Sequence, residues 1–256
     1  MHECLCYTIV LRQTPKKGSP MSLAYRSTEI EYPSSDGERM AENTLQFEWI
    51  VAIKGSLERI FRNDPQVFVA GDLLWYPVQG NNKIRVAPDA LVAFGRPKGY
   101  RGAYLQWLEN DIPPQVVFEV LSLGNRAGEM TRKFDFYNRY GVSEYYLIDP
   151  DRHTVDGWVR DGDSLREIPV VDGWTSPQLG ISFQVAEGES VRLLQPNGTL
   201  FHTYLEVCDE VEQSQLLVKE ASARMELEIT RAEREKARAE RLATKLRELG
   251  VDPSDL

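Results

Sequence analysis

Two stretches of the chain are predicted to be helices, and the first carries apolar residues at the three- to four-residue spacing of an amphipathic helix. In the first, residues 44–62, the spaced apolar residues are Leu45, Trp49, Ile53, Leu57, Ile60 and Phe61. The second covers residues 127–140 and is followed by Gly141, a residue type that commonly caps the C-terminal end of a helix. The pattern therefore predicts two helices, one before and one after a block of strands.

Shorter apolar runs between and after these helices are typical of β-strands. They cover residues 66–76, 83–94, 115–121, 142–148, 154–160 and 165–170. Gly71 interrupts the first run, and the turn Asp161-Gly162-Asp163 joins the last two as a hairpin. The order of elements predicts an α/β (α+β) fold, with a mixed β-sheet flanked by helices.

The composition changes at about Tyr204. Residues 206–249 are rich in Glu, Arg, Lys, Ala and Leu and contain neither Gly nor Pro, which predicts one long helix ended by Gly250. Its apolar stripe is irregular, and Ala holds most core positions over residues 230–239. Two interpretations stay open: a solvated helix laced with charges, or a coiled coil that joins two chains into a homodimer.

The N-terminal segment has a different character. Residues 13–20 (QTPKKGSP) have the composition of a flexible leader, and Met21 is a candidate translation start. The apolar residues 1–10 precede the basic patch, which is the reverse of a secretory signal, and no apolar run approaches the roughly 20 residues that span a bilayer. We therefore expect a cytoplasmic protein with no membrane segment.

These shifts divide the chain into three parts. We expect a flexible leader at residues 1–26, a globular domain at residues 27–203, and a long charged helix at residues 204–256. Hydrophobic residues make up 42% and charged residues 27% of the chain, which indicates a packed core. The net charge of −9 argues against broad nonspecific nucleic-acid binding but allows a local basic groove.

Metal binding by sulfur is not expected. The three cysteines are too few for a disulfide framework, and Cys4 and Cys6 have no second Cys/His pair near them in sequence.

Carboxylates within apolar strands are the strongest chemical signal. Glu119 interrupts the run of residues 115–121, where burial of an unpaired carboxylate would cost several kcal/mol. Asp89 opens another apolar run, and if the two strands are neighbours their carboxylates can bind one Mg²⁺. Lys133, on the helix that follows, would add a cation near a phosphate. The alternative for Lys133 is an ordinary salt bridge with Glu129, four residues earlier.

Four short segments stand out between about residues 32 and 183. They are Pro88-Asp89; Pro113-Pro114 leading to Glu119-Val120-Leu121-Ser122; Lys133 with Tyr137; and Gly141-Val142 through Glu144-Tyr145 to Asp149-Pro150. In this order and spacing they resemble the Uma-type putative restriction endonuclease family, within the PD-(D/E)xK nuclease superfamily.

The resemblance implies a nuclease core that depends on Mg²⁺ (or Mn²⁺) and acts on DNA, with its site at one edge of the sheet. Asp89 and Glu119 would be catalytic metal ligands, and the backbone carbonyl of Val120 would add a ligand. The superfamily lysine usually follows the second acid by two residues, but Leu121 holds that position here. The family's lysine lies on the next helix, which matches Lys133 as the residue that orients the attacking water.

Four further residues are candidates for the same site. Asp72, expected in a strand beside that of Asp89, could reach the metal or could be a bulge or turn residue. Glu42 and Glu48 flank the start of the first helix, from which superfamily nucleases often bring a glutamate to the metal, although Glu42 also suits a helix cap. Tyr137 lies one helical turn beyond Lys133.

A basic and aromatic segment separates the two carboxylates in sequence. Arg96, Lys98 and Arg101 lie among aromatic residues, and such a loop could follow a DNA backbone and stack on bases. The alternative is a surface loop whose apolar side chains pack on the core.

The leading hypothesis is therefore a Mg²⁺-dependent DNA endonuclease with a two-carboxylate site. One alternative is a catalytically inactive nuclease fold that serves as a DNA-binding or assembly module. Another is a hydrolase that acts on RNA or a different phosphodiester.

Overall fold

The computed structural model describes residues 30–35, 37, 39–122, 124, 127–186 and 188–248. Every helix and strand given below lies in the unit Tyr32–Leu256. The expected leader, with its candidate start at Met21, lies outside the described residues. The three-part division of the chain stays a prediction.

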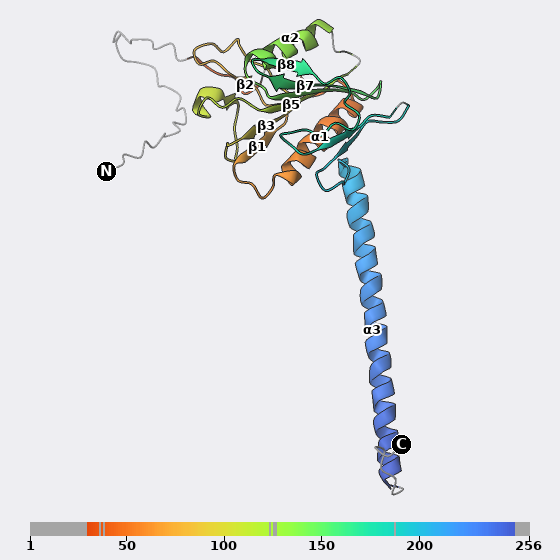
Figure 1. The fold of residues 1–256 in the computed structure, drawn as a ribbon. Helices are drawn as coiled ribbons and strands as arrows, with labels where there is room; N and C mark the ends of the chain where they lie inside the picture. The colour runs from red at the N-terminus through yellow and green to blue at the C-terminus, as the bar shows by residue number, and fades with distance from the viewer. Residues whose placement is uncertain are drawn as a thin grey trace, which may run out of the picture. The chain divides into compact units, whose positions relative to one another are not determined.

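A six-stranded sheet lies at the centre of the fold (Figure 1). In spatial order its strands are β1 (Val67–Ala70), β3 (Ala90–Phe94), β5 (Val116–Val120), β6 (Glu144–Asp149), β7 (Thr154–Asp161) and β8 (Ser164–Glu167). β5 and β6 run parallel, and the other neighbouring pairs are antiparallel. The prediction of an α+β fold with a mixed sheet and a β7–β8 hairpin is confirmed.

Both helices predicted for the globular domain form. α1 spans Thr44–Ile60, and α2 spans Ala127–Arg139 in the crossover between β5 and β6. The side chain of Asn43 accepts a hydrogen bond from the backbone N–H of Gln46, so Asn43 is the N-cap of α1. The cap role that the sequence left open for Glu42 therefore belongs to its neighbour.

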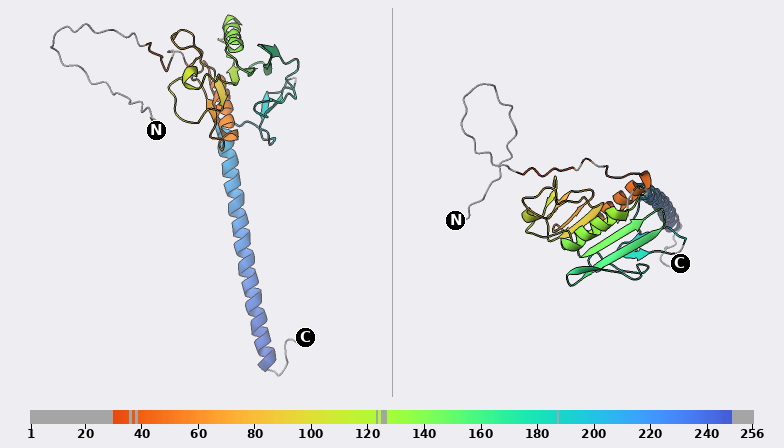
Figure 2. Two further views of the ribbon diagram at one scale, coloured as in Figure 1. Left: turned by 60° about the vertical axis from the view of Figure 1, so that its left-hand side comes forward. Right: turned by 90° about the horizontal axis from the view of Figure 1, so that it is seen from above.

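The two helices cover opposite faces of the sheet (Figures 1 and 2). Phe118 and Val120 of β5 pack in the core cluster that contains residues of α1, whereas Val117 packs in the cluster that contains Tyr137 of α2. Successive side chains of a strand point to opposite faces, so Glu119 shares the α2 face with Val117. The alternation in β5 thus directs its carboxylate toward α2.

The first predicted strand, residues 66–76, is interrupted. It splits into β1 and β2 (Trp75–Tyr76), and Asp72 lies between them with a φ of 48°. The backbone N–H of Asp72 donates to the carbonyls of Pro88 and Asp89. The expectation that Asp72 occupies a strand is wrong, because the left-handed backbone after Gly71 turns the chain out of the sheet.

The second predicted strand, residues 83–94, is also shorter than expected. β3 begins at Ala90, directly after Pro88-Asp89, because proline has no N–H to donate to a strand ladder. Smaller elements complete the domain: β4 (Tyr104–Leu105) pairs with β2, β9 (Ser182–Gln184) pairs with β10 (Arg192–Leu194), and a 3₁₀ turn covers Gln106–Leu108.

The predicted long helix is confirmed as α3, which spans Tyr204–Glu248 in 45 residues. Most of its side chains are exposed. The expected helix end at Gly250 lies outside the described residues. Among the helices that the structure describes, α3 included, none combines the length and apolar character needed to cross a membrane.

Candidate active site

The pairing of β3 with β5 brings two carboxylates together. The strands are antiparallel, and Ala90 lies opposite Phe118. Continuing this register by one residue puts Asp89 opposite Glu119. Directly opposed side chains on one face of an antiparallel pair have Cβ atoms about 4.5–5.5 Å apart. Two residues 30 positions apart in sequence therefore share one end of the sheet.

Glu119 is buried and receives two donors from α2. The residue is only 1% exposed. Lys133 Nζ donates to Glu119 Oε2 at 2.7 Å, and the hydroxyl of Tyr137 donates to Oε1. Lys133 and Tyr137 are four residues apart, one helical turn, so both can face the same strand residue. The cost of burying the carboxylate is thereby met by an ammonium and a hydroxyl.

The sequence left open a salt bridge with Glu129 as the alternative role of Lys133. Lys133 Nζ pairs with Glu119, and the neighbouring Glu129 lines the same cleft. Burial lowers the pKa of Lys133, but the carboxylates of Glu119 and Asp89 outweigh this effect and raise the pKa above its ordinary value. The side chain is therefore an ammonium at neutral pH.

The surroundings of Asp89 disfavour the ionised form of its side chain. Burial has the largest effect on its pKa and the carboxylate of Glu119 the next; together they raise the pKa well above the ordinary aspartate value. Lys133 and the backbone N–H of Val120 act in the opposite direction. That N–H donates to Asp89 Oδ2 at 2.7 Å. One ammonium thus stands against two carboxylates, an imbalance that a bound cation would relieve.

The backbone N–H and the backbone carbonyl of Val120 each bind a side chain of the site. Its N–H binds Asp89, and its carbonyl accepts a hydrogen bond from Gln46 Nε2 at 2.8 Å. Gln46 is buried on α1, and its Oε1 also accepts from the backbone N–H of Glu42. A carbonyl oxygen has two lone pairs, so the bond to Gln46 leaves one available to Val120 for a cation. Sequence spacing contained no signal for Gln46.

The carboxylates of Asp89 and Glu119 line a cleft of about 870 Å³. Of the residues expected in the site, the cleft lining contains Glu42, Asp72, Asp89, Glu119, Val120 and Lys133. Tyr137 is fully buried behind Glu119. Most of the residues chosen from the sequence therefore converge on one hollow, although they come from five separate segments.

The two acidic candidates near the start of α1, Glu42 and Glu48, differ in their position relative to the cleft. Glu42 precedes α1, lines the cleft, and accepts a hydrogen bond from the hydroxyl of Ser122. Glu48 is exposed on α1 and lines other surface hollows, not the cleft around Asp89. The geometry therefore favours Glu42 over Glu48 as a third acidic residue.

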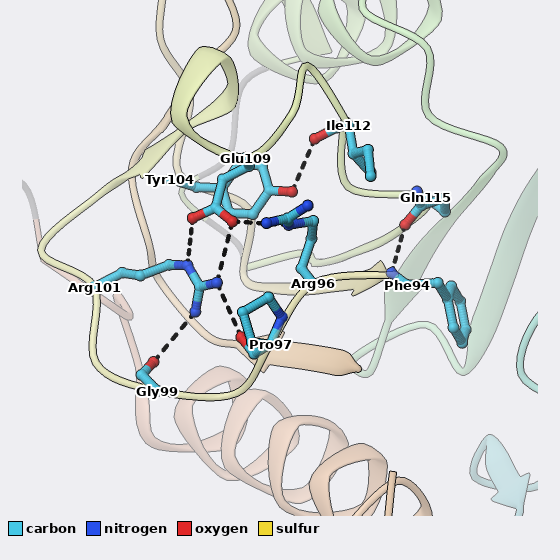
Figure 3. A network of polar contacts seen from close by, with 9 residues as sticks. All are labelled: Phe94, Arg96, Pro97, Gly99, Arg101, Tyr104, Glu109, Ile112 and Gln115. Atoms are coloured by element: carbon cyan, nitrogen blue, oxygen red, sulfur yellow. Dashed lines mark hydrogen bonds and ion pairs between the residues drawn. The ribbon is translucent and has the colours of Figure 1, made fainter. Parts of the chain in front are cut away.

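The basic loop predicted to bind DNA makes internal contacts. Figure 3 shows Arg96 and Arg101 converging on Glu109. Arg101 Nε lies 2.6 Å from Glu109 Oε1, and Arg96 Nε lies 3.0 Å from Oε2. The guanidinium of Arg101 also stacks over the ring of Phe68, 3.9 Å from its centroid. Lys98 Nζ donates to the backbone carbonyl of Val67. DNA contact by this loop stays a prediction.

Three other arginines border the cleft itself. Arg39, Arg85 and Arg132 line it together with Lys133, and Arg39 and Arg132 are exposed. They come from the segment before α1, the segment before β3, and α2. Arg39 and Arg85 lie far in sequence from the basic segment of residues 96–101, and Arg132 adjoins Lys133, so none of the three was predicted to bind DNA. They place three guanidinium groups along a cleft whose lining also includes the carboxylates of Glu42, Asp72 and Glu129.

The donor set fits a hard divalent cation. Mg²⁺ prefers oxygen ligands, keeps several waters, and needs only one or two protein carboxylates. Asp89, Glu119 and the Val120 carbonyl supply such oxygens in a region with a carboxylate in excess. Within the described residues, no group of three or more His, Cys, Asp or Glu side chains is arranged to bind a metal. The fit is therefore that of a partly hydrated ion, not of a closed structural site.

The fold and the cleft define an α+β protein with a paired-carboxylate and lysine centre. Residues 23–186, more than half of the chain, match the Uma2 family, described as "Putative restriction endonuclease". The chain belongs to this family, and the resemblance inferred from its segments is confirmed. It is therefore a member of a nuclease family.

No curated protein matches the chain significantly. Among solved structures, it is similar to a putative nuclease belonging to DUF820 from Anabaena variabilis, with 15% sequence identity and a TM-score of 0.42. The match covers 54% of this chain and 75% of the other.

Proposed function

We propose that the protein is a DNA endonuclease that depends on Mg²⁺ or Mn²⁺. The observation that carries the proposal is the placement of Asp89 opposite Glu119, with Lys133 bonded to Glu119, at the floor of an open cleft. Membership of the Uma2 family supports the reaction class.

Each residue has a defined task in this proposal. Asp89, Glu119 and the carbonyl of Val120 would hold the divalent ion, which when bound neutralises phosphate charge and lowers the pKa of water. Lys133 holds a positive charge beside Glu119, where it can orient the attacking water or stabilise charge that develops on the phosphate. Tyr137 fixes the orientation of the Glu119 carboxylate from behind. The arginines at the border of the cleft would hold the DNA backbone.

A cleavage assay with isosteric variants tests the site. Asp89→Asn and Glu119→Gln preserve shape and remove charge, so Mg²⁺-dependent nicking of plasmid DNA should fall by at least about 10³-fold in each. Asp135→Asn removes an exposed acid from α2 and should leave the rate unchanged. Nicking that persists in both site variants would exclude this centre as the catalytic one.

The same proteins separate the alternatives. A wild-type protein that binds DNA but neither cleaves it nor binds Mg²⁺ in calorimetry would be a DNA-binding or assembly module. A parallel assay with matched DNA and RNA strands decides the substrate, since cleavage of RNA alone would assign the chain to the RNA alternative.

Self-association forms a separate part of the proposal. The length and exposure of α3 support a homodimer formed through this helix. Light scattering on the full chain and on a chain ending before Tyr204 tests it. A dimer that persists after the truncation would show that α3 is not the interface.

A further inference from the structure

α3 exposes an apolar residue at every seventh position along most of its length. These residues are Tyr204, Val211, Val218, Met225, Ala232 and Ala239. All six are exposed, and Val218 and Met225 each retain 65% of their accessible surface. A seven-residue apolar repeat sustained over several turns is the signature of a helix that packs along another helix.

A second line of positions runs beside this repeat, three residues further along. It consists of Val207, Ser214, Ala221, Glu228, Glu235 and Leu242. The line is apolar or small except at Glu228 and Glu235, near the middle of the helix. These two acids limit the partners that the stripe can accept.

Charge is distributed unevenly along α3. From Tyr204 to Ile229 the helix carries seven acidic and two basic residues, whereas from Thr230 to Glu248 it carries four acidic and seven basic residues. The N-terminal half is therefore negative and the C-terminal half positive. A second copy of the same helix offers a complementary charge only if it runs in the opposite direction.

We propose that α3 packs against α3 of a second copy in an antiparallel coiled coil. The proposal rests on the self-association proposed above and is independent of nuclease activity. Each acidic half then lies along the basic half of the second copy.

The antiparallel register also matches the apolar layers. In antiparallel coiled coils, a residue of one line faces a residue of the other line on the second helix. With α3 overlapped along its whole length, Val211 faces Leu242, Ser214 faces Ala239, and Ala221 faces Ala232 of the second copy. In these three layers, Val211 and Leu242 are both large, and the other two pairs join small residues.

The parallel arrangement is disfavoured for a specific reason. In a parallel pair each position faces its own copy, so Glu228 would meet Glu228 and Glu235 would meet Glu235 inside the seam. Like charges facing each other across an interface are destabilising. In the antiparallel register the same glutamates face Met225 and Val218, along which their methylene groups can lie while the carboxylates reach water.

This orientation has a consequence for catalysis. A 45-residue helix is about 67 Å long. Antiparallel pairing would put the two nuclease domains at opposite ends of a rod of roughly this length, given the rise of about 1.5 Å per residue. Two such domains cannot act on adjacent phosphates of one short duplex site. The dimer would instead hold two separated segments of nucleic acid.

Disulfide trapping in the full chain tests the orientation. Cys4, Cys6 and Cys208 are first replaced by Ser, and Val211→Cys and Leu242→Cys are then made separately. After mixing and mild oxidation, we expect disulfide-linked dimers in the mixture at a level about tenfold above either variant alone, because aligned thiols have a millimolar effective concentration. Gln213→Cys mixed with Glu240→Cys is the matched control, since both positions lie away from the stripe and should not cross-link.

Each other outcome overturns the proposal. Cross-linking of Val211→Cys with itself and of Leu242→Cys with itself would show parallel helices. A dimer by light scattering with no cross-link in any sample would place the interface outside α3. A mass of one chain, 29.2 kDa, at micromolar concentration would remove the self-association itself while leaving the nuclease proposal intact.

Discussion

Asp89→Asn should stabilise the metal-free protein while it abolishes cleavage. Asp89 lies opposite the buried Glu119, so the folded chain holds two carboxylates together. Asparagine keeps an oxygen that can accept the bond from the Val120 N–H, and its amide can donate toward Glu119. The substitution therefore removes a repulsion without removing a buried acceptor.

The expected gain in stability follows from the distance between the carboxylates of Asp89 and Glu119. Two unit charges about 5 Å apart repel by about 3 kcal/mol at an effective dielectric constant of about 20. The ammonium of Lys133, bonded to Glu119 at 2.7 Å, offsets a large part of this repulsion. We therefore expect a gain of about 1–2 kcal/mol, which corresponds to a rise in Tm of about 2–8 °C for a domain of this size.

The assay is thermal denaturation in EDTA and in Mg²⁺. In EDTA the variant should melt above the wild type, and Mg²⁺ should raise the Tm of the wild type alone. Asp135→Asn controls for loss of an exposed acid and should match the wild type in both buffers.

The pH dependence has a defined sign. Because burial and Glu119 raise the pKa of Asp89 in the folded state, its ionisation destabilises the fold as the pH rises above the ordinary value of 3.8. The advantage of Asp89→Asn should therefore grow from acidic toward neutral pH. A variant that melts below the wild type in EDTA at pH 7 would refute the reasoning, since it would show that the carboxylate stabilises the empty site.

Three further changes give separate outcomes. Tyr137→Phe keeps the buried ring but removes the donor to Glu119, so urea denaturation should show a loss of about 1.5–3 kcal/mol, and an unchanged midpoint would contradict that hydrogen bond. Burial raises the pKa of Glu109, but the guanidinium groups of Arg101 and Arg96 outweigh it and the net pKa is lowered. The stability that Glu109→Gln loses at pH 7 should therefore decline as the pH falls below the ordinary glutamate value of 4.5 and through the lowered pKa. Arg132→Ala should weaken DNA binding and lower the slope of log affinity against log salt by about 1 in anisotropy titrations, whereas a larger change for Arg96→Ala would move the interface to the loop predicted from the sequence.

Local patterns were enough to predict most elements of the fold. α1 and α2 lie within a few residues of the predicted segments, because the apolar residues of the first repeat at helical spacing and Gly141 follows the second. The strand of Glu119 followed from a short apolar run after two prolines. Gly71 marked the interruption of the first strand, but the turn that takes Asp72 out of the sheet depends on backbone contacts with Pro88 and Asp89, which are distant in sequence.

The arginines also show that a local sequence pattern does not identify the partner of a side chain. Arg96 and Arg101 suggested a DNA-binding loop because they cluster in sequence, yet both side chains pair with Glu109. Arg85 and Arg132 lie outside that segment, and both border the cleft. A charge pattern specifies which residues can bind an anion, but the partner of each charge depends on how the chain folds.

Local periodicity and short motifs were enough to predict most of the elements, a buried position for Glu119 and the family to which the chain belongs. Three contacts appear only in the folded chain: Asp89 lies opposite that carboxylate, Lys133 pairs with it, and Gln46 donates to the Val120 carbonyl. Those contacts depend on strand register and on the faces that two helices cover. Register and face are set by packing of the whole core, which no single segment encodes.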